Sequence, residues 1–199
     1  MINYITIERE YGSGATEIGR RLHEATGIKC YGGEVLELAA KKMGVSVEEI
    51  LDIEEKSVDS LSFAFNMVEK AAKGEGADVP NSMKLHTIED QIIRDLADEG
   101  PAVFIGHCAS NALKDRDDVL SVYIHGSKTF NRFRAIEKYH ISPSEVDKIT
   151  DQINKRRNNY YYSTTGKKID NINNYGLVLD SSILGIKTCV DILADVIKI

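Results

Sequence analysis

The sequence predicts an α/β fold in which a parallel sheet lies between two layers of helices. Five short segments are apolar or rich in β-branched residues, as strands are, and each is followed by a stretch with the apolar spacing of a helix. Such alternation of strands and helices indicates a three-layer architecture with both sheet faces covered. The expected strands are residues 1–8, 28–31, 102–105, 119–125 and 175–179. At 199 residues, the chain is expected to form one domain, residues 1–199.

The composition is that of an ordinary globular protein and argues against several other classes. The apolar share of 42% and the charged share of 28% are those of ordinary globular proteins. No run approaches the roughly 18 apolar residues of a membrane span, and the N-terminus lacks the pattern of a signal peptide. Three separated cysteines, Cys30, Cys108 and Cys189, predict no disulfide framework. We therefore expect a cytoplasmic protein with no membrane partner, and the net charge of −6 argues against nucleic acid as a partner.

Helices are expected between and after the strands. Apolar residues recur at helical spacing in residues 16–25, 34–43, 60–73, 82–99, 128–139 and 183–197, and more briefly in residues 108–113. Ser46-Val47-Glu48-Glu49 has the pattern of a capping box and predicts a helix start. Residues 73–81, rich in glycine and polar residues, are expected to form a loop.

Two further capping signals lie in the second half of the chain. Ser142-Pro143-Ser144-Glu145 combines a capping box with proline at the first helical position, and predicts a helix that reaches Tyr162. Residues 164–174 are rich in turn formers. Ser181 or Ser182 is expected to cap the closing helix.

Basic residues are concentrated in one segment of this acidic chain. Between Lys128 and Asp170 there are ten lysines and arginines against five acidic residues. Such local asymmetry favours an anionic ligand at this segment over a partner that covers the whole surface. A solvated helix face is the alternative interpretation.

A glycine-rich loop, residues 9–16, follows the first strand and opens a helix, which is where a phosphate-binding P-loop occurs. Against G-x-x-x-x-G-K-[ST], Gly14 and Thr16 match, whereas Arg9 replaces the first glycine and Ala15 replaces the lysine. Backbone amides of the loop would bind phosphate, and the Thr16 hydroxyl would bind Mg²⁺. Arg9 is our candidate to supply the positive charge of the missing lysine. The expected phosphate-binding residues are Gly12, Ser13, Gly14, Ala15 and Thr16. A tight turn with glycines for packing is the alternative.

Several segments together resemble the cytidylate kinase-like family of P-loop proteins. They are ITIEREYGSG at residues 5–14, Glu17-Ile18-Gly19, Gly106-His107-Cys108-Ala109, residues 158–167 and Leu179-Asp180-Ser181-Ser182. The resemblance implies a nucleoside-monophosphate-kinase-type fold, with residues 1–45 and 100–199 as its core. It further implies a helical acceptor region, residues 46–99, and a basic lid at about residues 142–174. The implied activity is phosphoryl transfer from ATP, with Mg²⁺, to a nucleoside monophosphate or another small phosphate acceptor.

The basic segment supplies the remaining candidate catalytic residues. Arg132 is a candidate for contact with the donor phosphates. Arg134 is two residues farther along, so on a helix it would not face the same ligand. Arg156 or Arg157 would reach the transferred phosphoryl group from the lid. For each, the alternative is a solvent-facing side chain on a helix. Glu8 and Glu10 would bind Mg²⁺ through water or pair with Arg9. His107 would be an acid–base group or a hydrogen-bonded structural residue.

Two departures from the family pattern leave other functions open. The family usually has Asp and Arg near Tyr31, where this chain has Gly32 and Gly33, and an arginine where it has His107. Neither glycine nor neutral histidine can hold a phosphate in bidentate fashion. A nucleotide-binding sensor that transfers no phosphoryl group is therefore the alternative function.

Two kinds of partner are also considered. RNA binding through residues 156–162 is a weaker third hypothesis, which the negative net charge disfavours. Apolar residues of the 46–99 region (Phe63, Phe65, Met67 and Met83) would form either an acceptor lid or a homodimer interface.

Overall fold

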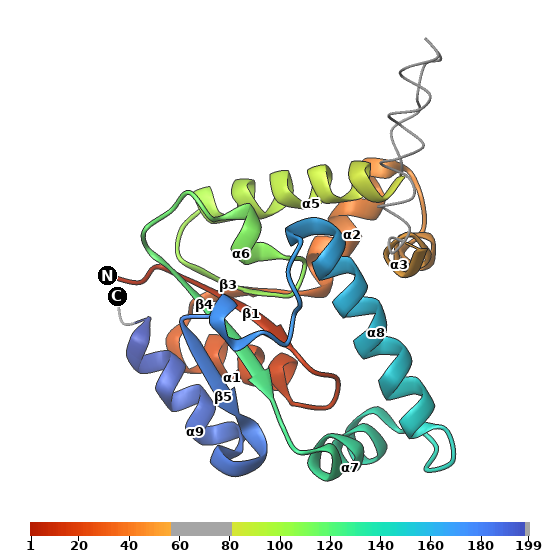
Figure 1. Cartoon of the computed structure of the whole chain (residues 1–199). Helices are drawn as coiled ribbons and strands as arrows, with labels where there is room; N and C mark the ends of the chain where they lie inside the picture. The colour runs from red at the N-terminus through yellow and green to blue at the C-terminus, as the bar shows by residue number, and fades with distance from the viewer. Residues whose placement is uncertain (57–80, 198–199) are drawn as a thin grey trace.

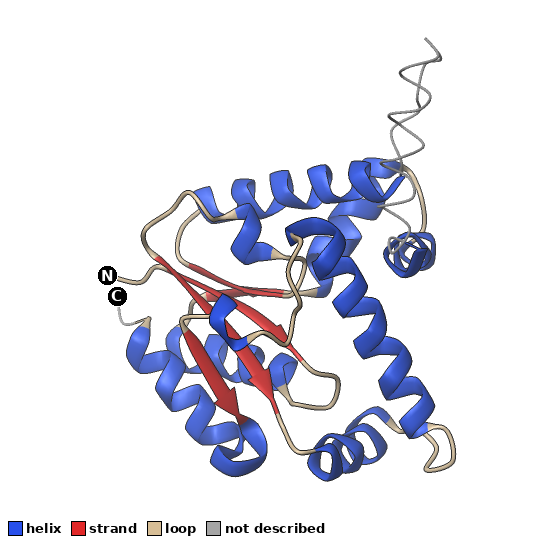
Figure 2. Cartoon of the chain, viewed as in Figure 1, coloured by secondary structure: helices blue, strands red, loops and turns tan. Residues whose placement is uncertain are grey.

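The computed structural model describes residues 1–56 and 81–197. Its described strands form one parallel sheet in the order β2-β3-β1-β4-β5 (Figure 2). The strands are β1 (Tyr4–Arg9), β2 (Lys29–Tyr31), β3 (Ala102–Ile105), β4 (Val119–His125) and β5 (Leu177–Asp180). The predicted three-layer α/β class is confirmed. Because all strands are parallel, their carboxyl ends lie along a single edge of the sheet.

Helices cover both faces of the sheet (Figure 1). One face carries α1 (Ala15–Thr26) and α9 (Ser181–Val196). The other carries α2 (Gly33–Met43), α5 (Asn81–Asp98) and α6 (Ala109–Ala112), with α3 (Val47–Lys56) beside them. The remaining elements are α7 (Lys128–Tyr139), α8 (Val146–Thr165) and the 3₁₀ turn η2 (Ile172–Asn174).

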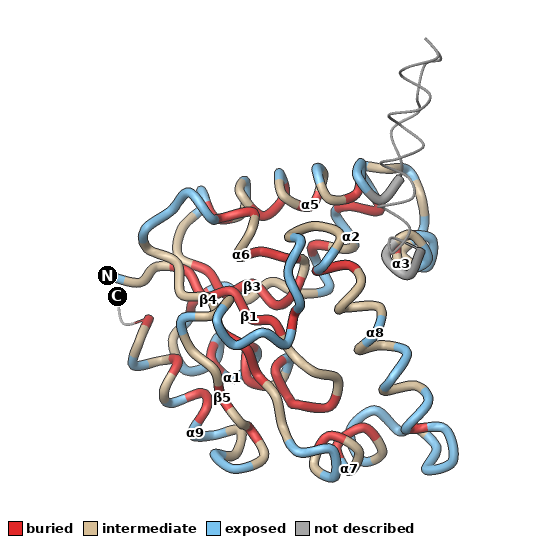
Figure 3. Tube along the Cα trace, viewed as in Figure 1, coloured by how far each residue is buried: buried red, intermediate tan, exposed pale blue. Residues whose placement is uncertain are grey.

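The alternation of side chains along β1 divides the core in two. Ile5 and Ile7 pack with α1 and α9, whereas Tyr4 belongs to the core beneath α2 and α5. Glu8 follows the same two-residue period and therefore lies on the Tyr4 side. Buried residues are concentrated in the strands and in the sides of the helices that face them (Figure 3). The sheet is thus a rigid base for residues at its carboxyl edge.

Helix α8 runs across this edge, from the neighbourhood of α7 toward α5 and α6 (Figure 1). Three of its side chains bind other elements. Asn154 Oδ1 accepts a hydrogen bond of 2.7 Å from the Tyr11 amide, and Arg157 Nη1 donates to the Arg9 carbonyl oxygen at 3.4 Å. Tyr160 donates its hydroxyl hydrogen to Glu89 of α5. These contacts hold α8 over the ends of β1 and β3.

The capping predictions have mixed outcomes. At the start of α3 the capping box is confirmed, because Ser46 and Glu49 exchange hydrogen bonds of 2.8 and 3.2 Å. The box predicted at residues 142–145 is wrong: these residues form a turn, and α8 begins at Val146. The predicted serine cap of α9 is also wrong, because Asp180 accepts from the amides of Ser182 and Ile183.

Part of the predicted helical insertion lies outside the described residues. The helix at residues 60–73 and most of the loop at residues 73–81 fall there, as do Phe63, Phe65 and Met67. Met83, at the start of α5, is exposed. Within residues 1–56 and 81–197, none of the helices is both long and apolar enough to span a membrane.

Candidate functional site

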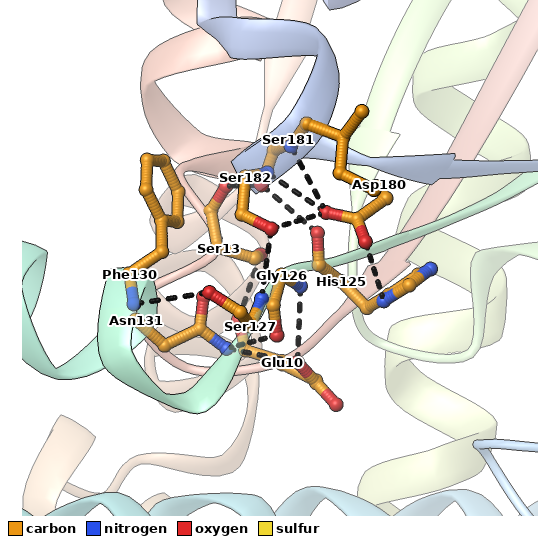
Figure 4. A network of polar contacts seen from close by, with 11 residues as sticks. Glu10, Ser13, His125, Gly126, Ser127, Phe130, Asn131, Asp180, Ser181 and Ser182 are labelled. Carbon is orange, nitrogen blue, oxygen red and sulfur yellow. Dashed lines mark hydrogen bonds and ion pairs between the residues drawn. The ribbon is translucent and has the colours of Figure 1, made fainter.

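The loop between β1 and α1 is held in place by a polar network that joins three strand ends (Figure 4). Ser13 is fully buried, and its hydroxyl donates to the Glu10 carbonyl oxygen at 2.9 Å. Ser181 Oγ lies 2.7 Å from the Ser13 carbonyl oxygen and 2.9 Å from that of His125. The Glu10 carboxylate accepts from the Gly126 amide at 3.2 Å and Asn131 Nδ2 at 2.8 Å. Glu10 therefore positions the loop, and the structure gives it no pairing with Arg9.

Packing requires the two loop glycines. Gly12 and Gly14 have φ of +83° and +85°, which L side chains rarely adopt. A Cβ at Gly12 would lie 2.4 Å from the Asn131 carbonyl oxygen, and one at Gly14 would lie 2.4 Å from Ile186 Cδ1. The packing interpretation of these glycines therefore has a direct structural basis.

Several amides of the loop are available to a ligand. The Tyr11 and Ser13 amides donate to Asn154 Oδ1 and the Glu10 carbonyl oxygen. Within the described part of the chain, the amides of Gly12, Gly14, Ala15 and Thr16 have no protein acceptor. Residues 12–15 are buried, whereas Thr16 is exposed at the N-terminus of α1. This arrangement fits a triphosphate on the amides and Mg²⁺ on the Thr16 hydroxyl.

A cavity of about 250 Å³ opens beside the loop, between the strand ends and α8. It reaches the loop only at Arg9 and Thr16. Its described lining also includes Glu8, Gly32, Gly33, Leu36, Leu51, Ile105, His107, Cys108, Arg156, Arg157, Tyr160 and Tyr161. The structure thus brings together four of the predicted site residues, Arg9, Thr16, Arg156 and Arg157.

Arg9 depends on the glycine that follows β3. A Cβ at Gly106 would lie 2.0 Å from Arg9 Nη1, so the guanidinium occupies the space that any side chain there would need. Arg9 Nη1 also lies 3.7 Å from Glu8 Oε2. Arg9 Nε is buried and has no hydrogen-bond acceptor among the described residues. The oxygen of an anionic ligand would supply that acceptor.

Burial and crowding of like charges perturb the groups of the cavity. Burial, and then the charges of Arg9 and Arg156, lower the pKa of Arg157 to about 9. Burial raises the pKa of Glu8 above its ordinary value, against the opposing effects of Arg9, His107 and Arg157. An anion bound here would relieve the repulsion between the arginines.

His107 belongs to a buried polar cluster behind the cavity. Its Nδ1 donates to Glu89 Oε1 at 2.9 Å, and Tyr160 donates to the other oxygen of the same carboxylate. Glu89 is fully buried. His107 and Cys108 both have positive φ, +58° and +51°, directly after Gly106. Three successive residues in this conformation make a sharp turn that directs the imidazole toward Glu89.

The arginines of α7 lie outside the cavity, although Arg134 adjoins the loop, because a Cβ at Gly14 would lie 3.3 Å from its Cζ. Arg132 is 40% exposed and pairs with Asp147, and its Nη2 donates to the Pro143 carbonyl oxygen at 2.9 Å. Arg134 is buried and binds Glu17 at 2.7 Å. Neither residue lines the cavity. The role predicted for Arg132 therefore has no geometric support from this cavity.

Glu89 is the part of the site that sequence reasoning missed. It lies on an amphipathic helix, and a glutamate there usually faces solvent. The sequence held one indication that Glu89 is buried: it borders the apolar face that Leu85, Ile88 and Ile92 define. Cys108, which also lines the cavity, is 2% exposed.

A family model now adds to this geometry. The model for the cytidylate kinase-like family matches residues 4–183, from the start of β1 to the start of α9. The chain belongs to the cytidylate kinase-like family. No curated protein matches the chain. Among the described residues, no group of three His, Cys, Asp or Glu side chains could hold a metal ion.

Solved structures with a similar fold include an uncharacterized protein and two small-molecule kinases. An uncharacterized protein from Eubacterium ventriosum is 19% identical with a TM-score of 0.70, covering 99% of this chain and 98% of its own. Shikimate kinase from Bacteroides thetaiotaomicron is 11% identical with a TM-score of 0.56, covering 98% of each chain. A gluconokinase from Sinorhizobium meliloti is 15% identical with a TM-score of 0.51, covering 97% and 94%. These likenesses establish a P-loop kinase-type fold.

Proposed function

We propose that the protein transfers a phosphoryl group from ATP, with Mg²⁺, to a small anionic acceptor. The observation that carries the proposal is the cavity in which Arg9, Arg156 and Arg157 converge beside the loop that ends at Thr16. Phosphoryl transfer depends mainly on positioning and on neutralising the charge of the moving group, and this cavity is built for both. The kinase-like family and the kinases among the structural neighbours support the same reaction class.

Each residue of the site has a defined task in this proposal. The free amides at residues 12 and 14–16 bind the phosphates of the donor, with help from the N-terminus of α1. Arg9 takes the place of the P-loop lysine, and Thr16 is the residue that would hold Mg²⁺. When bound, Mg²⁺ neutralises phosphate charge. Arg156 and Arg157 reach the transferred group from α8.

The acceptor is proposed as a class. The sequence predicted a nucleoside monophosphate or another small phosphate acceptor, and the family name agrees with that prediction. Gly32 and Gly33 supply no cation for an acceptor phosphate. The positive charge that the cavity offers comes from Arg9, Arg156 and Arg157 instead. A compact anion fits this arrangement.

The test is the variant Arg9→Ala. It removes the guanidinium that borders both the loop and the cavity, so ATP affinity or turnover should fall by about 10²-fold or more. Calorimetric titration with ATP and Mg²⁺ and an assay for ADP formation measure the two quantities. The matched control is Arg20→Ala, which removes an exposed arginine of α1 that pairs with Glu24. Unchanged affinity and turnover in Arg9→Ala would refute the role of Arg9.

A second candidate is a nucleotide-binding protein that transfers no phosphoryl group. The burial of residues 12–15 against α7 and α9 favours it, because a donor must fit into a closely packed loop. Under this alternative, ATP raises the melting temperature but no acceptor yields ADP. Incubation with CMP and with other small anions, followed by quantification of ADP, separates the two candidates.

A further inference from the structure

The cavity contains an acidic residue that the proposed reaction has not yet used. Glu8 is the one acidic residue among the described lining residues of the cavity, which otherwise offers Arg9, His107, Arg156 and Arg157. The residue is 5% exposed. Burying a carboxylate costs free energy unless the group is paired. We therefore do not expect a carboxylate in the wall of this cavity to have only a packing role.

The surroundings of Glu8 fix its carboxylate. Arg9 Nη1 lies 3.7 Å from Glu8 Oε2, and the Cys108 amide faces the same carboxylate and acts to lower its pKa. The charged and titratable groups that face it are Arg9 on β1, Tyr123 on β4, His107 and Cys108 after β3, Arg157 and Tyr161 on α8, and Tyr175 before β5. Behind His107 lies Glu89 on α5. Charged and titratable groups from several elements therefore surround the carboxylate.

The position of Glu8 restricts the chemistry of the acceptor. A phosphate acceptor would bring its negative charge against this carboxylate, whereas a hydroxyl would donate a hydrogen bond to it. The three arginines, Arg9, Arg156 and Arg157, still require an anionic group elsewhere on the same molecule. Thr16 and Arg9 line the same cavity, so the end of the donor and the acceptor group would meet near Glu8.

We propose that Glu8 is the general base of the reaction, and that the acceptor is a small alcohol that also carries a carboxylate or phosphate group. This inference rests on the proposed phosphoryl transfer. The hydroxyl oxygen forms a bond to the γ-phosphorus as the bond from that phosphorus to the β,γ-bridging oxygen breaks. ADP leaves with the electron pair of the broken bond. The hydroxyl proton passes to the Glu8 carboxylate, which releases it to solvent.

Burial supports this role, because it raises the pKa of Glu8 above the ordinary value of 4.5. A base is more effective as its pKa approaches the working pH. The reaction requires the ionised form, so kcat/KM should fall as the pH decreases through the pKa of Glu8. Above that pKa, Glu8 should add no further pH dependence.

The test compares wild-type protein with Glu8→Gln. Glutamine keeps an oxygen that can accept from the Cys108 amide, but it cannot take a proton. Water, gluconate and shikimate serve as hydroxyl acceptors, and CMP serves as a phosphate acceptor, each with ATP and Mg²⁺. Glu8→Gln should lower kcat by about 10²–10⁴-fold with a hydroxyl acceptor and abolish the acidic limb of the pH profile. ATP affinity should remain within a factor of about three of wild type, because the carboxylate does not bind the donor.

A second variant and a control keep the test decisive. Glu8→Asp retains the carboxylate one methylene farther back, and should keep the acidic limb at a reduced kcat. Glu99→Gln removes an exposed carboxylate that pairs with Lys29 at the opposite edge of the sheet, and should match wild type. Thermal unfolding and ATP titration show whether each variant is folded.

The outcomes distinguish this inference from the proposed function. If wild type forms ADP and Glu8→Gln has the same kcat and pH profile, Glu8 is not the base, although phosphoryl transfer stands. Transfer to the phosphate of CMP, detected as CDP, without transfer to any hydroxyl group, water included, also overturns the inference alone. If wild type binds ATP but forms no ADP with any of the four acceptors, both the inference and the proposed function fail.

Discussion

Gly106 and Arg9 form a mutually dependent pair. The glycine has a φ of +84°, and the guanidinium of Arg9 fills the space beside its Cα. A side chain at residue 106 would therefore displace the arginine from the cavity. The glycine after β3 is needed for two reasons, its backbone conformation and the close approach of Arg9.

We predict that Gly106→Ala impairs function by moving Arg9. ATP-dependent turnover should fall nearly as far as in Arg9→Ala, and the double variant should be little worse than Arg9→Ala alone. Gly27→Ala is the matched control, because Gly27 has a φ of +74° but nothing within 4 Å of a Cβ. It should lose stability by about 1–3 kcal/mol through backbone strain while retaining turnover. Additive losses of activity in the double variant would contradict the dependence.

Helices α1 and α7 are joined by one partly buried ion pair. Arg134 Nη2 lies 2.7 Å from Glu17 Oε2, and Arg21 contacts the other oxygen of the same carboxylate. The hydrogen bond from Arg134 lowers the pKa of Glu17. A carboxyl whose pKa is lower in the folded state stabilises the fold above its unfolded pKa, and this contribution is lost as the pH falls through its folded pKa.

Glu17→Gln should therefore lower the free energy of unfolding by about 1–3 kcal/mol at pH 7. The difference in unfolding free energy between the variant and wild type should shrink as the pH falls below the ordinary pKa of 4.5 and through the lowered pKa of the folded state. Glu17 of wild type then becomes protonated and neutral, as glutamine is. Urea unfolding at pH 7 and at acidic pH measures it. Glu24→Gln, which removes an exposed partner of Arg20, should cost no more than about 0.5 kcal/mol. A difference that is constant with pH would refute the assignment.

Local patterns predicted most elements because local forces decide them. Val119–His125 and Lys128–Tyr139 match the expected strand and helix at both ends, since alternation in the first and helical spacing in the second persist over their whole length. The start of α8 was missed because Ser142 uses its hydroxyl within a turn, where it lies 2.8 Å from Ser144 Oγ. The kink at Gly185 in α9 was missed as well, and it has a φ of +76°.

The site was predictable only where its residues adjoin a strand end. Arg9 and Thr16 flank the first loop, so the rule that ligands bind at the carboxyl edge of a parallel sheet placed them together. Arg156 and Arg157 needed the family resemblance, because no local pattern places a distant helix over the edge. Glu89 comes from yet another element, and its partnership with His107 is a tertiary contact that spacing does not encode.

Across the whole molecule, α8 connects parts that are far apart in the sequence. Its contacts reach the loop through Asn154, the end of β1 through Arg157 and α5 through Tyr160. Elsewhere α8 is mostly partly buried, and its exposed residues lie chiefly in its first half (Figure 3). Its position therefore depends on these polar contacts together with the packing of Val146, Tyr160 and Tyr161.

We predict that Asn154→Ala loosens α8 measurably. Loss of the acceptor for the Tyr11 amide should cost about 1 kcal/mol, which corresponds to a melting temperature about 2–4 °C lower for a chain of this size. Gln152→Ala, an exposed substitution on the same helix, is the control and should leave the melting temperature within about 1 °C of wild type. Calorimetric melting curves of the three proteins decide the matter. Equal melting temperatures would show that α8 is held by its other contacts.

The bond between Tyr11 and Asn154 has one further consequence. Asn154 can shield that amide only while α8 lies across the edge of the sheet. When the helix swings outward, the amide hydrogen meets water and exchanges with it. Deuterium uptake at the Tyr11 amide thus reports how often α8 leaves the edge of the sheet, and its measurement needs no added label.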